Sequence, residues 1–71
     1  MALISKIISM VKDDYEKAKE CAMKGHYSLS DEFFLKAYAN AQELYETYDH
    51  AMFLDEEIKL LKEILDEFEI L

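Results

Sequence analysis

The stretch SLSDEFFLKAYANAQELYETY, residues 28–48, decides the fold of this chain, because the remaining apolar pattern can be arranged around it. Apolar residues recur in it at alternating steps of three and four, which places their side chains on one face of an α-helix. These residues are Phe34, Ala37, Ala41, Leu44 and Tyr48, with Tyr38 and Tyr45 widening the face. A helix with such a face is stable in water only when the face is buried, so we expect it to pack against other helices.

The start of this helix carries two alternative N-cap signals. Ser28 followed by Asp31 has the spacing of a capping box. Ser30 between Leu29 and Phe34 has the spacing of an N-cap with a hydrophobic staple. The sequence leaves the choice between the two serines open.

The segments on either side show the same helical period. The first carries Ile4, Ile8, Val11, Tyr15, Ala18 and Ala22, and the last carries Leu54, Ile58, Leu61, Leu65 and Phe68. Gly25 stands where the end of a helix favours a residue with positive φ, so we place a turn over residues 25–29. The pattern predicts helices over about residues 3–24, 29–48 and 55–69 within a single domain.

The connection between the second and third predicted helices contains neither glycine nor proline. From Tyr48 to Ala51 to Leu54 the stripe takes two steps of three, and in one unbroken helix it would drift around the axis at this point. We therefore expect a short connection over residues 49–54 and an all-α, antiparallel up-down-up three-helix bundle. The alternative fold is a helical hairpin with a long continuous second helix, paired as a dimer.

The composition excludes several classes of function. The chain has 71 residues, with 16 acidic side chains against 8 lysines and a net charge of −8, which disfavours direct binding to nucleic acid. Its one cysteine excludes an internal disulfide. No segment has the length of a membrane span or the pattern of a signal peptide. We expect a cytoplasmic protein that does not associate with membranes.

Apolar residues make up 52% of the chain, more than the core of a three-helix bundle requires. The surplus lies beside the main stripes of the first and third helices, which would run parallel and bring it together. It consists of Leu3, Ile7, Met10, Phe53, Leu60 and Ile64. Because contiguous exposed apolar surface marks an interface, we expect these residues to bind another protein or, more plainly, a second copy in a dimer. The alternative is that both broad faces belong to the core.

The sequence contains no motif for catalysis, a cofactor or a metal. His50 has Glu46 one turn before it and Asp49 beside it, but the Glu-x-x-His pairs of a metal site in a helical bundle are missing. Cys21 has no histidine at helical spacing and suits a buried, small apolar position. Glycine-rich phosphate loops, zinc ligand clusters and nucleophile elbows are also missing. We expect no enzymatic activity and no cofactor.

Five residues give the chain a resemblance to a tetratricopeptide-type helical hairpin. Ala18, Gly25, Tyr27, Phe34 and Ala37 have the spacing of its small, turn, aromatic, large and small positions. The similarity covers one repeat over about residues 14–44, with Ser30 where the family prefers alanine and no closing proline. Microtubule-interacting and trafficking domains, which are three-helix bundles of similar size, are similar in the same way. The resemblance implies a module whose helix faces or grooves accept a partner segment.

The sequence therefore favours a small, acidic, non-catalytic protein–protein interaction module that acts through an apolar helix face. A first alternative is an acidic inhibitor, of phage or mobile-element origin, that blocks a basic nucleic-acid-binding host protein through the carboxylates of residues 13–20 and 55–69. A second alternative is a phosphoryl carrier that uses His50. Lactose-type phosphotransferase IIA subunits use a histidine in this way, but their alanine-histidine motif with a following glutamine is not found around His50. HEPN nuclease domains rely on an arginine, which this chain lacks.

Overall fold

The computed structural model describes residues 2–70, with side chains described for residues 4–68. This part of the chain is all-helical and contains no strand. It forms α1 (Ala2–Met23), α2 (Tyr27–Thr47), the short 3₁₀ turn η1 (His50–Met52) and α3 (Asp55–Ile70). The predicted all-α class and the predicted break between the second and third helices are confirmed, and each predicted helix boundary lies within two residues of the observed one.

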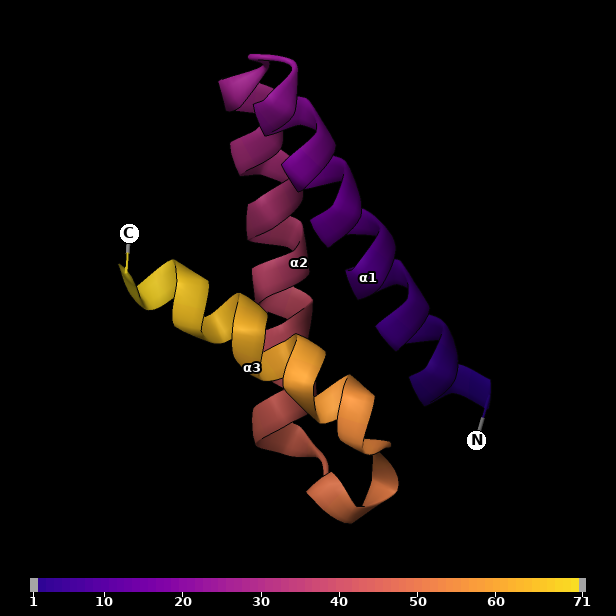
Figure 1. Ribbon diagram of the computed structural model, residues 1–71. Coiled ribbons are helices and arrows are strands. Elements are labelled where there is room, and N and C mark those ends of the chain that lie inside the picture. The colour runs from indigo at the N-terminus through magenta and orange to yellow at the C-terminus, as the bar shows by residue number, and fades with distance from the viewer. Residues whose placement is uncertain (1, 71) are drawn as a thin grey trace.

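The three helices form a bundle in which α3 is the least aligned member. α1 and α2 form a long antiparallel hairpin, and α3 crosses α2 obliquely (Figure 1). α3 packs mainly on α2 and meets α1 over a smaller region. The chain is compact, with a radius of gyration of 12.1 Å. The oblique crossing leaves the side chains of α1 and α3 only partly packed against each other, and this is where the candidate site lies.

The turn between α1 and α2 is shorter than the sequence indicated. Gly25 has a φ of +82°, as predicted for this position. Its amide donates to the carbonyl of Ala22 at 3.1 Å, and the amide of His26 donates to the carbonyl of Cys21 at 2.8 Å. This pair of hydrogen bonds is a Schellman motif, which ends α1 and lets α2 begin at Tyr27.

The prediction of an N-cap at Ser28 or Ser30 is wrong. The N-cap of α2 is His26, which makes no side-chain capping hydrogen bond. The hydroxyl of Ser30 instead donates to the carbonyl of Ala18 at 2.7 Å, which links α2 to α1. Ser30, which the local pattern assigns to a cap, is therefore used for a hydrogen bond between two helices.

The link between α2 and α3 is held by two side chains. Asp49 caps η1, because its Oδ1 accepts a hydrogen bond from the amide of Ala51 at 3.0 Å. The Nε2 of His50 lies 2.9 Å from the carbonyl oxygen of Tyr45, one of the last-turn carbonyls of α2. These contacts separate α2 from α3 where neither glycine nor proline is present.

The core is built from the predicted stripes together with two residues that were expected elsewhere. The stripe residues Ile8, Val11, Tyr15, Ala18, Ala37, Ala41, Leu44 and Leu61 are buried, as are Phe53 and Ile64. At the far end of α3, the ring of Phe68 stacks on Phe34 and Tyr38, with centroids 6.2 and 3.9 Å away. Three buried alanines let α1 and α2 approach closely, while aromatic rings hold the end of α3 against α2.

Candidate functional site

The structure divides the six residues that the sequence assigned to one apolar surface. Phe53 is 7% exposed and Ile64 is 0% exposed, and both belong to the core, so their assignment to a free surface is wrong. Leu3 lies outside the residues whose side chains are described. Ile7 and Leu60 are half-buried and Met10 is 52% exposed.

Leu60 of α3 does not lie beside Met10 of α1, because α3 packs on the other side of α1. The residues of α1 nearest α3 are Ile8 and Lys12, which line a groove with it, and Tyr15, which bonds to it. Successive residues of an α-helix are about 100° apart, so Met10 lies about 160° around α1 from both Ile8 and Lys12. Met10 therefore faces away from α3, so those members of the predicted surface whose side chains are described do not share one face.

A groove of about 450 Å³ lies between α1 and the first half of α3. We call it the α1–α3 groove and define it by the residues that line it. Its apolar lining consists of Ile8, Leu54 and Leu60, and its charged rim consists of Lys12, Glu56, Glu57, Lys59 and Glu63. The combination of an apolar lining with a charged rim is typical of surfaces that bind proteins.

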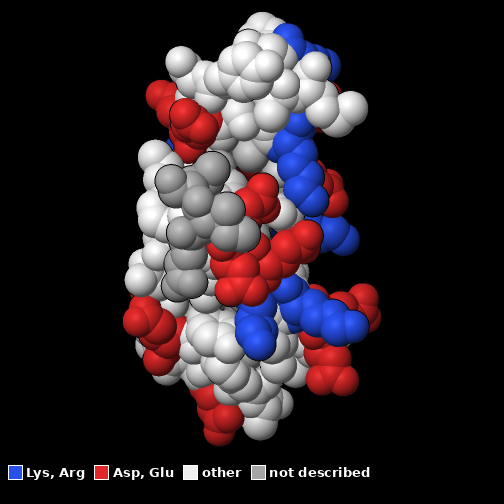
Figure 2. Space-filling view, turned by 60° about the vertical axis from the view of Figure 1, so that its left-hand side comes forward, with Lys and Arg blue, Asp and Glu red and all other residues white. Residues whose placement is uncertain are grey.

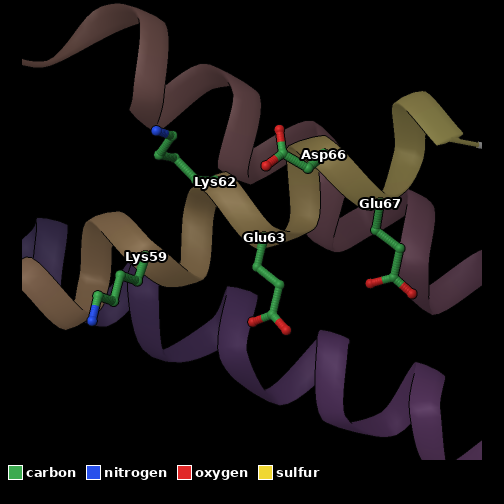
Figure 3. Close-up of a pocket in the computed structure, with 5 residues that line it drawn as sticks. All are labelled: Lys59, Lys62, Glu63, Asp66 and Glu67. Atoms are coloured by element: carbon green, nitrogen blue, oxygen red, sulfur yellow. The ribbon is translucent and has the colours of Figure 1, made fainter.

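Acidic charge is concentrated on the α3 side of this groove. α3 contains seven acidic residues and two lysines, whereas α1 contains four of each. Figure 3 shows a neighbouring pocket on α3 that shares Lys59 and Glu63 with the groove. There the carboxylates of Glu63 and Glu67 reach from α3 towards α1, while Lys62 and Asp66 point the other way. Figure 2 shows acidic side chains and lysines gathered over the middle of one face, with few charges around the α1–α2 turn at the top.

Leu54 is the most exposed apolar residue of the groove, at 64%. It occupies the N-cap position of α3, because its carbonyl accepts the first helical hydrogen bond from the amide of Ile58 at 3.0 Å. The carboxylate of Glu57 accepts from the amide of Leu54 at 2.8 Å, which is half of a capping box. Leucine cannot supply the other half, because it has no side-chain oxygen for the free amides of the first turn.

Beyond the groove, Tyr15 connects α1 to α3. Its hydroxyl donates a hydrogen bond to the carboxylate of Glu67, and the Nζ of Lys19 lies 4.2 Å from the centroid of its ring. Burial raises the pKa of the Tyr15 hydroxyl, and the hydrogen bond to Glu67 raises this pKa further. Tyr15 therefore stays protonated in the folded chain at pH values where an exposed tyrosine ionises.

We expect Tyr15→Phe to destabilise the fold by about 1 kcal/mol at pH 8, because one interhelical hydrogen bond is lost while the ring remains. In the unfolded chain Tyr15 ionises from about pH 10, whereas in the folded chain its pKa is higher. The unfolded state then holds fewer protons, so the stability that Tyr15 contributes falls as the pH rises above about 10. Urea unfolding at pH 8 and pH 11 checks this: the difference between the two proteins should shrink, and an unchanged difference would contradict the assignment.

His50 has a position that serves the fold, whereas Cys21, for which the sequence predicts a buried position, is only half-buried. The ring of His50 is half-buried, 4.2 Å from the ring of Tyr45, and its Nε2 is engaged by the carbonyl of the same tyrosine. The neighbouring Asp49 caps η1. This geometry gives no support to a phosphoryl carrier at His50. Within residues 4–68, no three histidine, cysteine, aspartate or glutamate side chains come together as a ligand set for a metal ion.

A scan against protein-family models and searches of curated proteins and of solved structures found no match to this chain. Among the helices that the structure describes, none is long and apolar enough to cross a membrane.

Proposed function

We propose that this protein is a non-catalytic interaction module that binds another protein in the α1–α3 groove. The observation that carries the proposal is Leu54, an exposed leucine at a helix N-cap and on the groove lining. Serine, aspartate or asparagine at an N-cap stabilises a protein by about 1 kcal/mol over an apolar residue. Violations of such local rules are expected at functional positions.

The free energy that burial of Leu54 would contribute to binding exceeds the stability that the fold loses by having leucine at this N-cap. Burying an exposed leucine side chain is worth about 1.5–3 kcal/mol, and Leu54 has most of its surface left to bury. Leu60 is half-buried in the same groove and would be covered by the same partner, whereas Ile8 beside it is already buried in the core. The groove thus combines an exposed apolar residue with a surrounding charged rim, the arrangement of an apolar centre and polar rim found in protein–protein interfaces.

The charge of the chain favours a basic partner. The net charge of −8 and the excess of carboxylates on α3 attract basic proteins over distances longer than direct contact and raise their rate of association. Such binding weakens as salt is added, but the apolar part of the contact does not. A partner that docks in the groove should accordingly be retained in part at high salt.

We expect Leu54→Ser to stabilise the isolated protein while weakening its binding. The serine hydroxyl can cap α3, so the melting temperature should rise by about 4–8 °C for each kcal/mol gained. Retention of partner proteins from a lysate by the tagged variant should fall, because the groove has lost its most exposed apolar side chain. The measurements are thermal unfolding and mass spectrometry of the retained proteins.

Met10→Ser is the matched control, because Met10 is also exposed and faces away from α3. It should leave both the melting temperature and the retained proteins nearly unchanged. If Leu54→Ser retains the same proteins as the unaltered chain, the groove is not the binding site and the proposed function falls.

A second candidate function is an acidic inhibitor that covers the nucleic-acid-binding surface of a basic protein. The seven acidic residues of α3 favour it, since carboxylates can substitute for phosphate contacts. This partner should be displaced by added nucleic acid and lost steeply at high salt. It should not respond to Leu54→Ser.

A second copy of the chain is the remaining candidate partner. Two copies with a charge of −8 each repel one another, so a dimer should become stronger as salt is added. Sedimentation at low and high salt therefore separates self-association from binding to a basic protein, which responds to salt in the opposite direction.

A further inference from the structure

We infer that the α1–α3 groove accepts a single amphipathic helix whose two flanks carry opposite charges, so that it binds in one direction only. This inference rests on the proposed function and specifies the chemistry of the partner.

The walls of the groove favour a helix over an extended segment. Both walls are α-helices, whose interior backbone amides and carbonyls bond within their own helix. An extended segment would find no free edge to pair with, and its buried backbone groups would stay unsatisfied. A helix satisfies its own backbone and needs only an apolar stripe. The α3 wall runs from Leu54 to Glu63, a rise of about 14 Å, which is matched by roughly three turns of a partner helix.

The two walls differ in charge. The α1 wall carries Lys12, whereas the α3 wall carries Lys59 and the carboxylates of Glu56, Glu57 and Glu63. Neither Glu56 nor Glu63 makes a side-chain hydrogen bond or ion pair with any part of the chain that the structure describes. Among the side chains that the structure describes, the one ion pair within 4 Å is Lys24 with Glu20, at 3.2 Å. Lys12 and Glu63 thus face the groove without an ion-pair partner of their own.

Opposite charges on the two walls determine the direction of the bound helix. Consider a helix with acidic residues on one flank and basic residues on the other. In one direction its acidic flank pairs with Lys12 and its basic flank pairs with Glu63. In the reverse direction its flanks exchange places, and like charges face each other on both walls. Charged flanking positions set partner choice and orientation in coiled coils by the same mechanism.

The test uses a synthetic 14-residue peptide with a leucine stripe, glutamates on one flank, lysines on the other and a nitroxide at its N-terminus. Paramagnetic broadening of the protein amides shows which end of the groove the nitroxide occupies. With the unaltered protein we expect broadening at one end only, near Leu54 or near Glu63. With the double variant Lys12→Glu, Glu63→Lys we expect it at the opposite end.

The double variant is matched to the unaltered protein, because it exchanges two exposed charges and keeps the net charge at −8. A control peptide with lysine on both flanks should bind the unaltered protein with no preferred direction, because it presents the same charge to both walls of the groove. These outcomes concern the peptide with glutamates on one flank and lysines on the other. Broadening at the same end in both proteins, broadening at both ends, or no binding of this peptide would overturn the inference.

Failure of this inference and failure of the proposed function give different results. If the peptide does not bind while Leu54→Ser still releases the natural partner, the groove binds a protein but not a helix of this kind. If Leu54→Ser leaves the natural partner bound, the groove is not the site, and both proposals fall.

Discussion

Replacing Ile64 by alanine should lower the free energy of unfolding by about 2–5 kcal/mol, because it removes three buried carbons and leaves a cavity. Ile64 is fully buried in the core where α3 packs on the hairpin. A domain of this size has a total stability of roughly 4–10 kcal/mol, so this loss is a large fraction of the total. Urea unfolding followed by circular dichroism measures the loss.

Met10→Ala is the control for this prediction, because the sequence placed Met10 and Ile64 on one surface and the structure separates them. Met10 is 52% exposed, and its truncation should cost no more than about 0.5 kcal/mol. Equal losses for the two variants would contradict the burial of Ile64. An Ile64→Ala protein as stable as the unaltered chain would indicate that this residue is exposed.

Replacing Ala41 by leucine should destabilise the fold by about 1–3 kcal/mol or more, for the opposite reason. Ala41 and Ala37 are fully buried in the core cluster, and a larger side chain there forces neighbouring side chains or helices apart. Leucine has a higher hydrophobicity and a good helix propensity, so a loss of stability can only come from crowding. Thermal unfolding measures it.

The same substitution at Ala39 provides the matched control. Ala39 lies on the same helix but is exposed, so Ala39→Leu should change the stability by less than about 0.5 kcal/mol. If Ala41→Leu is as stable as Ala39→Leu, the small residues do not set the distance between α1 and α2, and the packing described here is wrong at this position.

The helices could be predicted because helical periodicity is a property of the local sequence. The stripes of α1 and α2 recur with few interruptions, and the phase change at Tyr48, Ala51 and Leu54 marked the end of α2. The caps were harder, since Ser28 and Ser30 fit a capping pattern that the fold does not use. After the Schellman turn at Gly25, α2 begins two residues later and runs antiparallel to α1. The hydroxyl of Ser30 then lies within hydrogen-bonding distance of α1.

The side of the hairpin on which α3 packs could not be predicted. Periodicity identifies the buried face of each helix but not the handedness of the bundle, which depends on tertiary packing. The sequence therefore grouped Ile7 and Met10 with α3, whereas Ile8 and Lys12 are the residues that line the groove with it. The pattern also assigns Phe53 and Ile64 to a surface, because they lie beside the main stripe. The structure buries both, so the buried face here is wider than the main stripe.

One signal in the sequence could have identified the groove. The third helix was expected to start at Asp55, which makes Leu54 its N-cap, and a leucine at this position is unfavourable. The apolar period instead assigns Leu54 to the buried stripe of the third helix. The structure shows it exposed beside Ile8 and Leu60.

Binding in the α1–α3 groove is tested most directly by the methyl NMR spectrum of this protein with and without a partner purified by its retention on the tagged chain. Methyl groups report on several faces of the molecule, since Ile8, Leu54 and Leu60 line the groove and Met10, Met23 and Leu35 are exposed elsewhere. We expect the signals of the three groove residues to shift on binding and those of the other three to stay in place. Shifts confined to Met10, Met23 or Leu35 would show that the partner binds another face and would contradict the assignment of the α1–α3 groove.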